Sequence, residues 1–135
     1  MTIHARLALS WNLMRFAYGA VLILAGLDKL LGTDLIVYWP KYISPFVLGI
    51  LPVSVPVFLA FMGIVEVVVG IMFVTKWPRI AGFLSVIWLV LIAINLTLMG
   101  LFDIAIRDVL LAVGTFVLAE LSAAVEDLHL TKAVD

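Results

Sequence analysis

Residues 56–74 read PVFLAFMGIVEVVVGIMFV, and this stretch decides the fold class of the chain. An α-helix needs about 20 mostly apolar residues to cross the hydrocarbon core of a bilayer, and the stretch has that length. Glu66 is its single charged residue. The stretch therefore predicts a membrane-spanning helix that carries one carboxylate in its interior.

The composition of the whole chain also indicates a membrane protein. Its 135 residues are 66% hydrophobic and 13% charged, whereas soluble domains are about 45–50% apolar and about 25% charged. A net charge of -1 provides no electrostatic basis for binding nucleic acid. The absence of cysteine excludes disulfides, thiol chemistry and cysteine-bound metal. We therefore expect no metal site and no covalent cofactor.

Four stretches have the length and apolar character of membrane spans. We place them at about 8–30, 54–75, 79–101 and 103–124. The last three are joined by short connections, which force neighbouring helices to run antiparallel. The apolar start has no early small-residue cleavage site, so we interpret it as a retained span rather than a signal peptide. The prediction is a single all-α domain, 1–135, folded as an integral membrane antiparallel four-helix bundle.

Residues 32–53, between the first two spans, have a different character. Pro40, Pro45 and Pro52 would interrupt a spanning helix. Tyr38 and Trp39 suit the headgroup boundary, where aromatic side chains are half hydrated. We expect an interfacial cap, rich in aromatic residues and proline, that contains short helical turns. A re-entrant loop is the alternative, and its backbone would have to be covered by protein or water.

The distribution of cations predicts an orientation. The side of the bundle that holds both termini carries more lysine and arginine than the cap side. The first group is Arg6, Lys76, Arg79 and Lys132, and the second is Lys29 and Lys41, with Arg107 at the edge. Because positive loops stay in the cytoplasm, we expect both termini there and the cap outside.

The carboxylate of Glu66 needs a partner inside the membrane, and we expect Arg15 of the first span to supply it. The two residues are predicted at similar depth in antiparallel helices, and glycines at helical spacing lie on the same face as each ion. The glycines are Gly19 and Gly26 in the first span and Gly63 and Gly70 in the second. Small residues let helices approach closely, so these two faces are predicted to meet. The buried pair is either a structural link between two helices or part of a functional pocket or proton path.

A second group of polar residues lies toward the cap side and is predicted to form the ligand site. Its main donor would be Arg107, whose planar guanidinium can bind a carbonyl oxygen or an oxyanion. Asp103 is four residues before Arg107, the favoured spacing for a helix ion pair, and we expect Lys29 to pair with Asp108. The group consists of Asp28, Lys29, Asn95, Asp103, Arg107 and Asp108. The alternative is that many of these side chains are hydrated at the headgroup level.

The spans contain no evident redox centre. His4 and His129 fall in the flanks of the chain, where they could not ligate a haem or metal inside the bundle. Trp11, Trp77 and Trp88 are interpreted as packing residues or interface anchors. A redox activity would therefore need a partner chain or a bound cofactor.

Four segments together resemble the DoxX-like family of small four-helix membrane proteins, over nearly the whole chain. They are RFAYGAVLILAGLDKL (15–30), FMGIVEVVVGIMFV (61–74), PRIAGFL (78–84) and IAIRDVLLAVG (104–114). That family includes the small membrane subunit of thiosulfate:quinone oxidoreductase. The resemblance implies pattern residues at Arg15, Gly19, Gly26, Lys29, Glu66, Arg107 and Asp108. It also implies a bacterial or archaeal cytoplasmic membrane.

The resemblance implies a membrane subunit or accessory protein of quinone-linked oxidoreduction. Such a protein would anchor a partner subunit, or a second copy of itself, and shape a site for a quinone or lipid. Two alternatives remain open. Intramembrane acids at Glu66, Asp108 and Glu120 would permit transport or proton relay. The chain could equally be an assembly subunit of a larger membrane complex, without ligand chemistry.

Overall fold

The computed structural model describes residues 2–134 and shows an all-α protein. It is 84% helical, and no strand occurs among these residues. The elements are α1 (Ile3–Leu31), the 3-10 helix η1 (Trp39–Tyr42), α2 (Pro45–Ile50), α3 (Val55–Val74), α4 (Pro78–Leu98) and α5 (Phe102–Val134).

Four of the helices are long and apolar enough to cross a membrane: α1, α3, α4 and the Phe102–His129 part of α5. Their number and order agree with the predicted spans. The two outer helices are longer than predicted, since α1 begins at Ile3 and α5 continues past residue 124. The reason is that a helix can continue into water with charged residues, whereas the apolar pattern marks only the part that can cross lipid.

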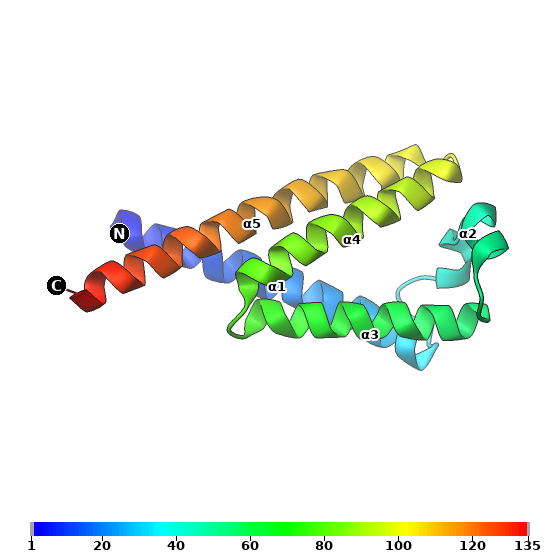
Figure 1. Ribbon diagram of the computed structural model, residues 1–135, viewed down its shortest axis with the longest axis horizontal. Helices are drawn as coiled ribbons and strands as arrows, with labels where there is room; N and C mark the ends of the chain where they lie inside the picture. Colours follow the sequence, from blue (N-terminus) through cyan, green and yellow to red (C-terminus); the bar gives the residue numbers. More distant parts are fainter. Residues whose placement is uncertain (1, 135) are drawn as a thin grey trace.

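The four long helices form two antiparallel pairs. Helix α1 packs along α3, and α4 packs along α5, while contacts between the two pairs are fewer. Figure 1 shows the pairs close together at the α3–α4 turn and diverging toward the opposite end, where η1 and α2 lie. Both termini lie at the end that holds this turn. The segment between α1 and α3 is therefore a cap at the far end of the molecule from the termini.

Glycines determine how closely α1 and α3 approach. A Cβ atom on Gly26 would lie 2.6 Å from the Gly63 carbonyl oxygen, and one on Gly63 would lie 2.5 Å from the Gly26 carbonyl oxygen. Gly19 and Gly70 face each other in the same way, at 3.0 and 2.9 Å. The predicted contact between the two glycine faces is confirmed, and it establishes the register of α1 against α3.

The apolar core is divided into two clusters. One lies toward the α3–α4 turn and is centred on Val69, Phe73 and Leu118. The other lies toward the cap and is centred on Leu96 with two buried alanines. Along α3, Glu66 lies on the cap side of Val69 and Phe73. This charged side chain is therefore placed between the two apolar clusters.

Candidate functional site

The central feature of the site is a buried ion pair between Lys29 and Glu66. Lys29 Nζ lies 2.6 Å from Glu66 Oε2, and the two side chains are only 5% and 4% exposed. Lys29 comes from the last turns of α1, and Glu66 from the middle of α3. The indole Nε1 of Trp88, on α4, donates to Glu66 Oε1 at 3.2 Å. Both carboxylate oxygens are therefore hydrogen-bonded, each from a different helix.

The predicted pair of Arg15 with Glu66 is wrong. Arg15 instead donates to the carbonyl oxygens of Val74 and Thr75, at 2.8 and 3.3 Å. Val74 is the last residue of α3 and Thr75 is its C-cap, so both carbonyls lie where helical partners run out and the helix dipole is negative. The Arg15 guanidinium also lies 4.5 Å from the centre of the Trp11 ring. Arg15 thus stabilises the C-terminal end of α3.

Side-chain direction explains why Lys29 replaces Arg15. The glycine register places Ile23 opposite Glu66 and Val74 opposite Arg15. Helical side chains lean toward the N-terminus of their own helix. In this antiparallel pair, Lys29 lies nearer the cap than Glu66, so the Lys29 side chain leans away from the cap and the Glu66 side chain leans toward it, and the two meet. Arg15 lies on the other side of Glu66, toward the termini, and its side chain leans away from the carboxylate.

Trp39 lies against the Lys29 ammonium. Lys29 Nζ is 3.5 Å from the centre of a Trp39 ring, a cation–π arrangement. The indole Nε1 of Trp39 donates to Asp28 Oδ2 at 2.8 Å. Asp28 also accepts hydrogen bonds from Thr33 Oγ1, Leu35 N and Ile36 N, at 2.5, 2.9 and 3.1 Å. Asp28 thereby fixes the loop after α1 and holds Trp39 beside Lys29.

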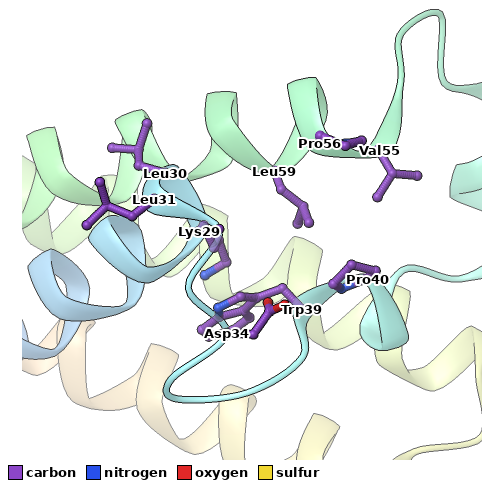
Figure 2. Close-up of a pocket in the computed structure, with 10 residues that line it drawn as sticks. Lys29, Leu30, Leu31, Asp34, Trp39, Pro40, Val55, Pro56 and Leu59 are labelled. Atoms are coloured by element: carbon purple, nitrogen blue, oxygen red, sulfur yellow. The ribbon is translucent and has the colours of Figure 1, made fainter.

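A pocket of about 280 Å³ lies between the end of α1, this loop and the beginning of α3. Lys29, Asp34 and Trp39 line it together with apolar side chains, among them Pro56 and Leu59. Figure 2 shows the Lys29 amine pointing toward Trp39, and Leu59 projecting from α3 toward the loop that carries Asp34 and Trp39. The pocket thus combines one ammonium and one exposed carboxylate with mostly hydrocarbon walls.

The other predicted ligand-site residues do not gather around Lys29. Asn95 ties α4 to the cap, since its Oδ1 accepts from Ser44 N at 2.9 Å and its Nδ2 donates to Tyr42 O at 2.6 Å. Asp103 and Arg107 are exposed on α5, and Asp108 is half-buried there. None of the three lines the pocket under Trp39.

Two predicted ion pairs of this group are absent. Among the side chains that the structure describes, no ion pair joins Lys29 to Asp108 or Asp103 to Arg107. The two helix pairs diverge toward the cap (Figure 1), so the start of α5 does not converge with the end of α1. Lys29 is bound by Glu66 of its own helix pair instead. The six residues predicted to cluster are therefore found in four places: Lys29 in the buried pair, Asp28 at the loop after α1, Asn95 at the cap, and the remaining three on α5.

The sequence interpretation missed the roles of Trp39, Trp88 and Asp28. Trp88 was expected to act only in packing or anchoring, yet it binds a carboxylate. The signal that could have revealed the site was the direction of helical side chains, which favours Lys29 over Arg15 as the partner of Glu66. Nothing in the sequence alone indicated that Asp28 would collect donors from the loop that follows it.

The arrangement provides a hydrogen-bond donor inside an apolar surrounding. A lysine ammonium has three N–H donors, and one of them is bound to Glu66. Within the described residues, no group of three or more potential metal ligands occurs. The site is therefore suited to hold the polar end of an otherwise apolar molecule.

Comparison with known proteins returns no relative: no family model, curated protein or solved structure matches this chain.

Proposed function

We propose that this chain is an integral membrane protein of the DoxX-like type that holds a quinone or another lipid-like molecule under its cap. In this proposal it anchors a partner protein that carries out quinone-linked oxidoreduction. The single observation that carries the proposal is the buried Lys29–Glu66 pair beside a pocket with mostly apolar walls. Ionisable side chains inside membrane spans are rare and mark ligand sites or proton paths. Apolar pockets with few polar groups are typical of small-molecule sites.

Each residue of the site has a distinct role in the proposal. Lys29 donates a hydrogen bond to a carbonyl oxygen of the ligand, and Glu66 compensates the lysine charge. Trp39 forms one wall, held in place by Asp28. The apolar part of the ligand lies along α3 at Leu59. Lys29 replaces Arg107 as the main donor because Arg107 is exposed on α5 and does not line the pocket.

The electrons must come from outside the chain in this proposal. The sequence has no cysteine, and its two histidines, His4 and His129, lie near the ends of α1 and α5. A partner subunit or a bound cofactor would supply the redox centre. The chain's own contribution would be to bind and orient the ligand and to exclude water.

The proposed location is the cytoplasmic membrane of a bacterium or archaeon, with both termini in the cytoplasm. Lys76 and Arg79 support this orientation, since both are exposed at the α3–α4 turn, on the same end of the bundle as the termini (Figure 1). Positive residues concentrate on the cytoplasmic side.

Native mass spectrometry in mild detergent tests the ligand. We expect the parent protein to carry a quinone or lipid, or to take up an added decyl-substituted benzoquinone. Leu59→Trp, which fills the pocket, should abolish retention. Leu98→Trp is the matched control, because Leu98 is 57% exposed on α4, and it should retain the ligand. If the parent neither carries nor takes up a ligand, the assembly-subunit interpretation replaces this proposal.

A further inference from the structure

We infer that the pocket under Trp39 selects a neutral headgroup whose oxygen accepts a hydrogen bond, and that it rejects anionic phosphate headgroups. The inference rests on the proposed ligand pocket and names the chemical class of its ligand. Carbonyl and hydroxyl headgroups belong to this class, and phospholipids with a net negative charge do not.

The requirement for an acceptor follows from Lys29. Its ammonium has donors and no acceptor, and it is the single cationic side chain among the residues that line the pocket. One donor is bound to Glu66, and the ammonium faces Trp39. A headgroup that has donors and no acceptor would leave the free N–H groups of this ammonium without a hydrogen bond. A ligand oxygen that accepts a hydrogen bond from Lys29 would satisfy one of the remaining N–H donors of the ammonium.

The exclusion of anions follows from the charges around Lys29. Glu66 already neutralises the ammonium at 2.6 Å. Asp28 adds a second carboxylate, which is only 5% exposed. All four partners of Asp28 act as donors to its two oxygens, which is the pattern of an ionised carboxylate. Asp34 adds a third carboxylate on the pocket wall.

The position of Asp34 is determined by the loop. Its φ of 49° lies in the left-handed region, which aspartate tolerates better than most residues. The next two amides, of Leu35 and Ile36, are bound to Asp28. The loop therefore holds Asp34 at the pocket and keeps Asp28 ionised. Because Glu66 already balances the charge of Lys29, the charges of Asp28 and Asp34 have no cationic partner among the described side chains. A phosphate that enters meets net negative charge.

The test uses fluorine NMR of the full chain labelled with 5-fluorotryptophan in a neutral detergent. The Trp39 resonance, assigned with Trp39→Phe, reports on the pocket, and the exposed Trp77 is the reference. The probes are dioctanoylglycerol and dioctanoyl phosphatidic acid, which share their acyl chains. We expect the neutral lipid to bind roughly ten-fold more tightly, a small preference because Asp34 is exposed and its charge is partly screened by solvent.

A matched pair of variants tests the cause. Asp34→Asn removes a carboxylate from the pocket wall and should reduce the preference several-fold. Asp103→Asn removes an exposed carboxylate from α5 and should leave the preference unchanged. Equal or tighter binding of phosphatidic acid, or an unchanged preference in Asp34→Asn, overturns the inference while the pocket itself stands. If neither lipid nor decyl-benzoquinone shifts the Trp39 resonance, both the inference and the proposed function fail.

Discussion

Lys29 and Glu66 link the end of α1 to the middle of α3 through an ion pair of 2.6 Å, with both side chains almost fully buried. Around such a pair the dielectric constant is low, so each charge depends on the other and on Trp88, which donates to the second oxygen of Glu66. The pair has two effects that can be measured separately. It stabilises the contact between α1 and α3, and it places the Lys29 donor at the pocket.

A double-mutant cycle measures the stability of the pair. Glu66→Gln alone should lower the free energy of unfolding by about 3–5 kcal/mol, because Lys29 is left charged and buried. Lys29→Met combined with Glu66→Gln should recover part of this loss, since no unpaired charge remains. The measurement is reversible unfolding in mixed micelles. Arg15→Gln is the control, and its effect should add to that of Glu66→Gln within about 0.5 kcal/mol. Coupling of Glu66 to Arg15 rather than to Lys29 would contradict the observed register.

The glycine contact predicts a position-dependent cost of adding one methyl group. Gly63→Ala places a Cβ atom 2.5 Å from the Gly26 carbonyl oxygen, so the helices must separate, at a cost of about 1–3 kcal/mol. Gly49→Ala, in α2, meets no atom within 4 Å and should be neutral or stabilising by up to about 1 kcal/mol. Thermal unfolding of the two variants under the same conditions tests the difference, and equal losses would refute the close packing of α1 on α3.

Asn95 is expected to hold the cap rather than a ligand. Asn95→Leu removes its bonds to Ser44 N and Tyr42 O, and loss of one such bond corresponds to roughly ten-fold faster exchange of the Ser44 amide. Thr97→Val is the control, because the Thr97 hydroxyl donates to Ala93 O of its own helix. Hydrogen–deuterium exchange of residues 42–48 is the measurement. Unchanged protection in Asn95→Leu would show that the cap is held by other contacts.

The proposed topology predicts labelling from opposite sides of the membrane. Lys41 lies in η1 and Lys76 in the α3–α4 turn, at opposite ends of the helices (Figure 1). The sequence has no cysteine, so Lys41→Cys and Lys76→Cys each introduce a unique thiol. An impermeant maleimide added to intact cells should label position 41, and position 76 should react only after the membrane is opened. Labelling of both positions in intact cells would refute the topology, and the reverse pattern would invert it.

The sequence by itself determined the number of long apolar helices, their order and the place of the cap. The reason is that crossing a membrane depends on a sum of side-chain transfer energies over about 20 consecutive residues. Proline and aromatic residues marked residues 32–53 as different in the same local way. The glycine faces could also be predicted, because spacing along one helix identifies the residues on one face.

Only the tertiary structure decided which charges meet. Glu66 has cationic candidates in Arg15 and Lys29, and the choice depends on the helix register and on the direction in which the side chains lean. The position of α5 depends on the divergence of the two helix pairs, which separates the start of α5 from the end of α1 (Figure 1). Among the described side chains, Lys29 pairs with Glu66 and not with Asp108. Asp28 accepts the hydrogen bond that holds Trp39 beside Lys29, and this donor lies 11 positions further along the chain. Such contacts depend on the path of the backbone in three dimensions. The apolar and glycine patterns of the separate helices carry no information about this path.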